Sequence, residues 1–214
     1  MMNSQKTEWE SRFGRAYTQR NLFTPSELDK LYLDRYGVTR TGMNHEFLDF
    51  LDRDIMILEV GSNIGNQLHL LHNMGFKNLY GLEVNSYAIE KSNKLNSGLP
   101  IYVIKGEALN IPFKDSFFDL IYTSGVLIHI NPKNIMKVID EISRCSKQYI
   151  WGFEYFQDEG YNEIQYQGQN NMLWKTDFKK LYLENHPELK LIKEKHYPYL
   201  ENNHLIDQMF LLEK

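Results

Sequence analysis

The sequence predicts an α/β fold built on a mostly parallel sheet, with helices on both faces. From residue 54 onward, short apolar runs alternate with helical patterns, as expected for parallel strands joined by crossover helices. The run 55–60 (IMILEV) is apolar without alternation, which is typical of a strand covered on both faces. Near the end, 189–199 and 208–214 have no helical pattern between them, which indicates an antiparallel addition near one edge.

Each element follows from a local pattern. Two helices should precede the first strand, at 23–37 and 43–53, and the first has a capping box at Thr24 with Pro25 at its first position. Strands are expected at 54–61, 78–84, 101–108, 117–127 and 148–156. Helices are expected after the first strand up to Gly75, and at 86–95, 132–145 and 175–186. Between the fifth strand and the last helix, 157–175 reads as a polar, aromatic loop.

Composition limits the class of protein. The chain of 214 residues carries a formal net charge of −4 and lacks a basic cluster, which disfavours a nucleic-acid partner. Its single cysteine, Cys145, lies on an apolar helical stripe and favours a reducing compartment. The polar start and the lack of any apolar run near 18–20 residues argue against a signal segment or a membrane span. We therefore expect a cytoplasmic protein without a membrane partner.

The loop Gly61–Ser62–Asn63–Ile64–Gly65 follows the first predicted strand and opens a helix. Glycines there allow a tight turn and a close approach of a ligand to the backbone. The helix start offers free N–H groups and the positive end of its dipole. The alternative is an ordinary strand-to-helix turn, since short glycine motifs are common.

Two acidic residues end the next predicted strands. Glu83 follows Gly61 by roughly 20 residues, the spacing at which a carboxylate accepts hydrogen bonds from a ribose diol. Glu107 and the backbone of Ala108 could meet the amine and a ring nitrogen of adenine, because the carboxyl ends of parallel strands line the ligand crevice. For each acid the alternative is a solvated surface position. Further candidates at the same strand ends are Glu59 and Val84.

The loop itself discriminates between adenosine-bearing cofactors. The dinucleotide fingerprint needs three glycines, but Asn63 and Asn66 occupy its second and third positions here. Asn63 adds bulk where a pyrophosphate would lie against the backbone. The sequence therefore favours S-adenosylmethionine over NAD.

The segment 124–132 (SGVLIHINP) follows the fourth predicted strand. Small and apolar residues there, Ser124, Gly125 and Val126, could wall the adenine. His129 is the first candidate for a general base, because its unperturbed pKa lies near neutral pH. The alternative is that His129 packs locally and transfers no proton.

Taken together, ILEVGSNIGNQ, GLEVN and FFDLIYTSGVLIHINP resemble a class I S-adenosylmethionine-dependent methyltransferase. More specifically, the chain resembles the pseudaminic acid biosynthesis-associated methylases over nearly its full length. The segments that carry this resemblance are 12–21, 61–67, 125–132, 144–156, 164–178 and 210–214.

This resemblance implies a Rossmann-like sheet of seven strands, mostly parallel with one antiparallel strand near an edge. The implied reaction is O- or N-methylation of a small sugar or sugar nucleotide in a surface-glycan pathway, with S-adenosylhomocysteine as product. It also implies one domain over 1–214, with a helical cap at 1–53, a cofactor-binding core at 54–156, and an acceptor loop with terminal strands at 157–214.

The resemblance directs attention to further residues. The segment 13–21 shows no helical stripe, and its Tyr17 and Arg20 could fold over the cofactor, with Arg20 pairing the methionine carboxylate. Glu154 is the second candidate for a base. The expected acceptor-binding residues, whose mixture of aromatic faces and polar groups suits a sugar, are Tyr155, Tyr166, Gln167, Gln169, Trp174 and Lys175.

Three rival functions remain open from the sequence. The chain could be a non-catalytic, cofactor-binding member of the fold, since fold does not imply activity. It could methylate tRNA or another nucleic acid, although its charge counts against this. It could be an NAD-dependent oxidoreductase, which Asn63 and Asn66 disfavour. A metal site is not expected, because His69 and His72 have no third ligand at metal spacing.

Overall fold

The computed structural model describes residues 4–214, which form two compact units that divide between Glu107 and Ala108. Each unit is described by itself. Within residues 4–214, none of the helices has the length and apolar character needed to cross a membrane.

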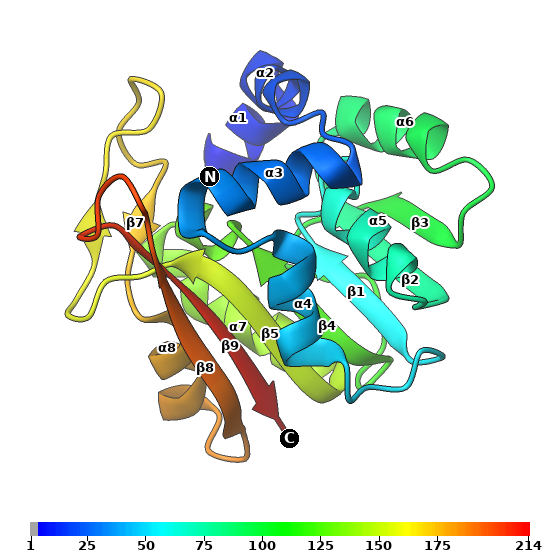
Figure 1. Cartoon of the computed structure of the whole chain (residues 1–214). Coiled ribbons are helices and arrows are strands. Elements are labelled where there is room, and N and C mark those ends of the chain that lie inside the picture. The colour runs from blue at the N-terminus through cyan, green and yellow to red at the C-terminus, as the bar shows by residue number, and fades with distance from the viewer. Residues whose placement is uncertain (1–3) are drawn as a thin grey trace. The chain divides into compact units, whose positions relative to one another are not determined.

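The first unit contains three parallel strands in the order β3-β2-β1. The crossovers between them carry helices, as the alternating pattern predicts (Figure 1). The core of this unit includes Leu58, Leu68 and Leu82, which are almost completely shielded from solvent. The elements are β1 (Met56–Val60), α5 (Asn66–Asn73), β2 (Asn78–Glu83), α6 (Ser86–Leu95) and β3 (Ile101–Lys105).

Between residue 4 and β1 the structure has four helices, where the sequence predicted two. Thr24 and Glu27 form the expected capping box at the start of α3, and α4 begins and ends earlier than the predicted helix at 43–53. The prediction that 13–21 lacks a helix is wrong, because Ser11 caps α2 by accepting the N–H of Phe13 at 3.2 Å. These helices are α1 (Ser4–Glu10), α2 (Arg12–Arg20), α3 (Pro25–Tyr36) and α4 (Arg40–Leu48).

In the second unit, four strands share one sheet in the order β4-β5-β9-β8. β4 pairs with β5 in parallel, whereas β9 is antiparallel to both β5 and β8. The chain therefore has a mixed sheet of seven strands, mostly parallel with one antiparallel strand near an edge, and the predicted fold class is confirmed. The elements are β4 (Phe118–Ser124), the 3-10 helix η1 (Leu127–His129), α7 (Pro132–Cys145), β5 (Ser146–Tyr155), α8 (Phe178–Asn185), β8 (Lys190–Pro198) and β9 (Ile206–Glu213).

The segment 157–175 is more ordered than the predicted loop. Two short strands, β6 (Asn162–Glu163) and β7 (Trp174–Lys175), pair in antiparallel fashion. Between them, Tyr166 and Gln169 exchange backbone hydrogen bonds of 2.9 Å around a two-residue turn. Gln167 and Gly168 at this turn both have positive φ, as a tight hairpin turn requires. The signal was missed because the strands are only two residues long.

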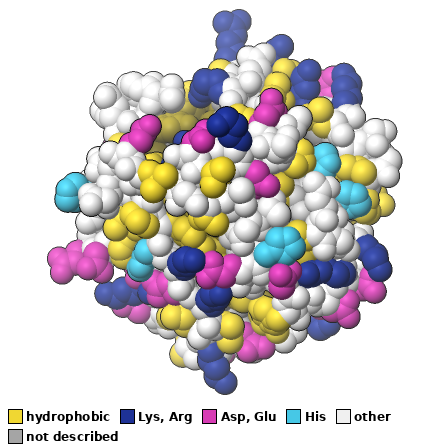
Figure 2. Space-filling view, viewed as in Figure 1, with side chains coloured by type: hydrophobic (Ala, Val, Ile, Leu, Met, Phe, Trp, Pro, Cys, Tyr) yellow, Lys and Arg dark blue, Asp and Glu magenta, His cyan; other side chains and the backbone are white. Residues whose placement is uncertain are grey.

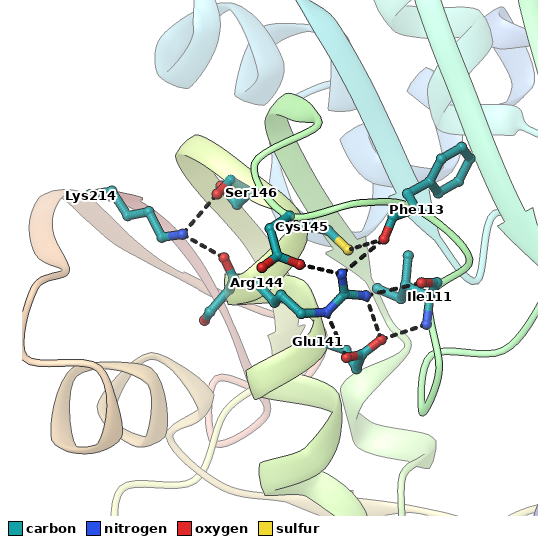
Figure 3. Close-up of polar contacts among 9 residues, drawn as sticks. Ile111, Phe113, Glu141, Arg144, Cys145, Ser146 and Lys214 are labelled. Carbon is teal, nitrogen blue, oxygen red and sulfur yellow. Dashed lines mark hydrogen bonds and ion pairs between the residues drawn. The ribbon is translucent and has the colours of Figure 1, made fainter.

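A polar clamp holds the end of α7 (Figure 3). The inner face of this helix is buried as predicted, and Cys145 lies at its end with its thiol 3.6 Å from the Phe113 carbonyl. The Arg144 guanidinium donates to the carbonyls of Ile111 and Phe113 at 3.0 and 2.9 Å. It also pairs with Glu141 at 2.8 Å and Asp115 at 2.7 Å. One planar side chain therefore fixes the approach to β4 against α7.

Lys214 completes this clamp from the C-terminal end of β9. Its ammonium donates to the carbonyls of Ser143 at 2.6 Å and Ser146 at 2.8 Å (Figure 3). Carbonyls at a helix C-terminus lack partners within the helix, and a cation there complements the dipole. Lys214 thereby fastens the last strand to the last turn of α7.

Candidate functional site

The glycine loop forms a tight turn between β1 and α5. Gly61 and Gly65 have φ values of +72° and +83°, and the Gly65 N–H donates to the Ser62 carbonyl at 2.8 Å. Asn63 between them also lies in the left-handed region, at φ +50°. Gly65 is the residue that precedes α5, so the free N–H groups of this helix open onto the loop. The tight turn that the sequence predicted is present, and its role in binding a ligand stays a prediction.

Glu83 connects this loop to the end of β2. One carboxylate oxygen accepts the N–H of Asn63 at 2.8 Å, and the other accepts the N–H of Asn85 at 2.8 Å. Burial raises the pKa of Glu83, and these backbone hydrogen bonds oppose the shift. Because each carboxylate oxygen has two lone pairs, Glu83 can organise both turns and still accept a hydroxyl.

Asn63 and Asn66, which stand where the dinucleotide fingerprint has glycines, form hydrogen bonds that the sequence did not predict. The Thr18 hydroxyl donates to the Asn63 side-chain oxygen at 2.9 Å. The Asn66 amide donates to the carbonyl of Asn21 at 2.8 Å. Both bonds tie the segment of α2 to the glycine loop, so we call this pair of contacts the α2 latch.

Asn85 makes a third connection to the N-terminal helices. Its amide donates to the Trp9 carbonyl at 2.6 Å, while its oxygen caps α6 by accepting the Tyr87 N–H. Gly14 permits this approach, because a Cβ there would meet the Trp9 carbonyl and lie 2.6 Å from the Asn85 amide. Tyr17 packs edge-on against Trp9, with ring centroids 5.3 Å apart. The sequence could have shown that Asn85 caps a helix, because asparagine is a preferred N-cap residue. It could not have shown the contact of Asn85 with Trp9, which is distant in the chain.

The other candidate cofactor-binding residues of the first unit differ in their burial and in their contacts. The Glu107 carboxylate pairs with the Lys6 ammonium at 3.0 Å, an ion pair that raises the pKa of Lys6. An adenine amine at Glu107 would therefore share the carboxylate with Lys6. Arg20 is exposed on α2, and Val84 is half-buried. Glu59 is buried at the end of β1.

In the second unit, Glu154 organises the turn that follows β4. It is 1 % exposed and accepts the N–H groups of Val126 at 3.0 Å and Ile128 at 3.4 Å. Burial raises the pKa of Glu154 to about 7, while its hydrogen bonds act in the opposite direction. The Gly125 N–H donates to the carbonyl of Phe153 at 2.8 Å. Two contacts thus hold the predicted adenine-wall segment, which starts at Ser124, against β5.

His129 fastens the segment 157–175 onto η1. Its Nδ1 lies 2.7 Å from the Met172 carbonyl, and its ring lies 4.9 Å from the ring of Tyr166. A carbonyl only accepts, so Nδ1 carries the proton and Nε2 the lone pair. Burial lowers the pKa of His129 to about 4. His129 is therefore neutral at pH 7, and a weaker base than an exposed histidine.

The remaining acceptor candidates lie near β5 or at the hairpin tip. The Lys175 ammonium lies over the Tyr155 ring, 5.3 Å from its centroid. Trp174 is buried beside it, whereas Gln167 is exposed at the turn. Across residues 4–214, no group of three His, Cys, Asp or Glu side chains could hold a metal ion.

Comparison with known proteins agrees with this geometry. Residues 58–149 match the model of a methyltransferase domain. No curated protein sequence matches the chain. The match agrees with the predicted S-adenosylmethionine-dependent methyltransferase and with the predicted cofactor.

Solved structures share the fold. The N1-methyltransferase of 1,6-didemethyltoxoflavin from Burkholderia thailandensis, which has bound S-adenosylhomocysteine, superposes with a TM-score of 0.74 at 12% identity, over 100% of this chain and 90% of that one. An S-adenosylmethionine-dependent methyltransferase from Methanosarcina mazei gives 0.62 at 18% identity, over 78% and 95%.

The same comparison also shows how much the fold leaves open. The cyclase SpnF superposes with a TM-score of 0.67 at 12% identity, over 89% of this chain and 96% of that one. A protein described as a cyclase thus shares the architecture. Fold similarity at this identity therefore does not fix the acceptor or the reaction.

Proposed function

We propose that the chain transfers a methyl group from S-adenosylmethionine to an oxygen or nitrogen of a small, sugar-type metabolite in the cytoplasm. The resemblance to the pseudaminic acid-associated methylases supports assigning this reaction to a bacterial surface-glycan pathway. The methyltransferase domain at 58–149 and the single buried cysteine support the class of enzyme and a reducing compartment.

The first unit supplies the groups that would hold the cofactor. Bound S-adenosylmethionine supplies an electrophilic methyl group on a sulfonium. Glu83 would accept the ribose hydroxyls, and the turn from Gly61 to Gly65 would lie against the adenosine. The α2 latch through Thr18 and Asn63 would hold the N-terminal helices against that turn. These residues bind and orient, which is the main work of such an enzyme.

The acceptor proposal rests on one observation in the second unit: the segment 157–175 is folded back onto η1. The bond from His129 to Met172 and its ring contact with Tyr166 hold the segment there. This arrangement gathers aromatic and polar side chains in one unit, which suits a polar, ring-shaped acceptor.

Glu154 and His129 are the two candidates for the general base, and they differ in pKa and in hydrogen bonding. A base works best when its pKa lies near the operating pH. The pKa of Glu154 meets this condition, but its oxygens already accept two backbone N–H groups. His129 is neutral, with a lone pair on Nε2, but its pKa of about 4 makes it a weak acceptor of protons. We therefore assign loop positioning to both, and proton acceptance from a sugar hydroxyl to Glu154 before His129.

Charge favours a small acceptor over a nucleic acid. The net charge is −4, and Figure 2 shows Lys and Arg side chains interspersed with Asp and Glu on the face in view. A nucleic-acid enzyme needs cationic contacts to phosphates.

The test is to incubate the protein with methyl-labelled S-adenosylmethionine and, in separate reactions, a small-molecule extract or total RNA, and to identify the labelled product by mass. We expect one labelled sugar-type product. A labelled RNA would replace the acceptor class proposed above. Binding of the cofactor without any labelled product would indicate that the protein is a non-catalytic member of the fold.

A further inference from the structure

Lys175 is an expected acceptor-binding residue, and the proposed function does not say which part of the acceptor it would bind. Lys175 lies on β7 and is only 9% exposed. Its ammonium lies over the face of Tyr155. Among the described residues, the recorded contacts of this ammonium are the cation–π contact with Tyr155 and a longer-range attraction to Asp207.

This situation is energetically unfavourable in the isolated protein. Because most of the side chain is buried, the ammonium loses part of its hydration, and a cation–π contact only partly replaces it. Burial lowers the pKa of Lys175, and the negative charge of Asp207 opposes the shift. A lysine kept in such a position is better explained by a ligand than by stability.

The residues near Lys175 indicate how its ammonium can stay charged and still bind a ligand. Asp207 is directly opposite Tyr155 in the β5–β9 pair and is 1% exposed. Its carboxylate accepts the hydroxyl of Tyr199 at 3.2 Å. Asp207 thus supplies a favourable field to Lys175 while it is hydrogen-bonded to Tyr199, and three donors of the ammonium remain for a ligand.

We propose that Lys175 binds an anionic group, a carboxylate or a phosphate, on the methyl acceptor. This inference rests on the proposed function, and it narrows the substrate class to acidic sugars and sugar phosphates. The Tyr155 face beneath the ammonium would carry the apolar side of the same ring. The site lies within the second unit, and all of its residues belong to β5, β7, β9 and the turn before β9.

The first experiment separates this inference from the proposed function. A metabolite extract is divided by anion exchange into retained and unretained fractions, and each is incubated with the full-length protein and methyl-labelled S-adenosylmethionine. We expect label only from the retained, anionic fraction. Label only from the unretained fraction would overturn the role of Lys175 and leave the proposed function standing. Label from neither fraction would contradict the proposed function itself.

The second experiment tests the residue on the anionic fraction. Lys175→Met is expected to raise the KM for the acceptor at least tenfold, with an unchanged Kd for S-adenosylmethionine, and Lys175→Arg should restore part of the loss. The matched control is Lys180→Met, because Lys180 is an exposed lysine on α8. An unchanged KM in Lys175→Met would overturn the proposal.

A thermal melt of the same variants excludes a merely structural role. Removing a largely buried charge should leave the Tm of Lys175→Met equal to or above that of the native protein. A Tm lower by several degrees, together with lost activity, would show that Lys175 supports the fold, and the anion site would be withdrawn. The carboxylate and phosphate alternatives are then distinguished by treating the retained fraction with phosphatase, which abolishes labelling only for a phosphate.

Discussion

At the scale of single residues, Glu154 and His129 are buried groups whose pKa values move in opposite directions. The pKa of Glu154 is raised from 4.5 to about 7, so the stability it contributes is present below pH 4.5 and is lost as the pH rises to 7. The pKa of His129 is lowered from 6.5 to about 4, so its contribution is present above pH 6.5 and is lost as the pH falls to 4. In the native protein the two slopes largely cancel.

We expect a single substitution at either residue to reveal the pH dependence of stability that the other residue causes. Glu154→Gln removes the Glu154 contribution, so its unfolding free energy relative to the native protein should rise by up to about 3 kcal/mol between pH 4.5 and 7.5. His129→Asn keeps a donor for the Met172 carbonyl, and its relative stability should fall by up to about 3 kcal/mol between pH 4 and 6.5. Urea denaturation at several pH values measures both. Parallel curves for all three proteins would show that neither group titrates abnormally.

The α2 latch makes a second prediction at this scale. Asn63 has positive φ, so Asn63→Gly fits the backbone while it removes the bond from Thr18. Loss of one hydrogen bond costs about 1 kcal/mol, and we expect a Kd for S-adenosylmethionine about fivefold higher by calorimetry. Thr18→Val should show the same loss, and the double variant no more than either alone. An unchanged Kd in both would separate the latch from cofactor binding.

At the scale of elements, the packing of α2 depends on Gly14. Helix propensity alone predicts that Gly14→Ala stabilises the protein by about 0.5–1 kcal/mol. The added Cβ would collide with the Trp9 carbonyl and approach the Asn85 amide. Because backbone must shift, we expect a net loss of about 1–3 kcal/mol by urea denaturation. Arg12→Ala, an exposed change on the same helix, is the control and should have little effect; a stabilised Gly14→Ala would show that α2 is not so closely packed.

The clamp at the end of α7 gives a prediction for the second unit. Arg144→Met removes the bonds to the carbonyls of Ile111 and Phe113 along with both ion pairs. Hydrogen bonds to a charged group are worth about 1.5–3 kcal/mol, and we expect a loss in this range by urea denaturation. Arg144→Lys should recover little of it, because an ammonium lacks the planar fork that reaches several acceptors at once. Full recovery by lysine would mean that charge, and not fork geometry, holds the clamp.

At the scale of the whole molecule, the sequence predicted what long patterns encode. Alternating apolar runs and helical stripes fixed the sheet and α7, and the antiparallel β9 followed from the missing crossover. The β6–β7 pair escaped, because strands of two residues are too short to show a period. Length does not explain why α2 was missed, because the predicted α5 and α8 are each one residue shorter. The contacts of Asn63, Asn66 and Asn85 also escaped, because each joins residues far apart in the chain. Local sequence carries a cap or a turn, but not the partner that a side chain meets after folding.

The choice of cofactor is a property of the whole chain and gives the last prediction. A ligand that binds only the folded state stabilises it by about 2.7 kcal/mol at a concentration 100-fold above its Kd. For a chain of this size, that corresponds to a rise in Tm of roughly 5–11 °C. We expect S-adenosylhomocysteine and S-adenosylmethionine to give this rise in a thermal melt, and NAD at the same concentration to give none. Asn63 and Asn66 explain the difference, because their side chains hold the segment of α2 at the turn where a pyrophosphate would need bare backbone. Stabilisation by NAD would contradict this explanation and would favour the NAD-dependent oxidoreductase.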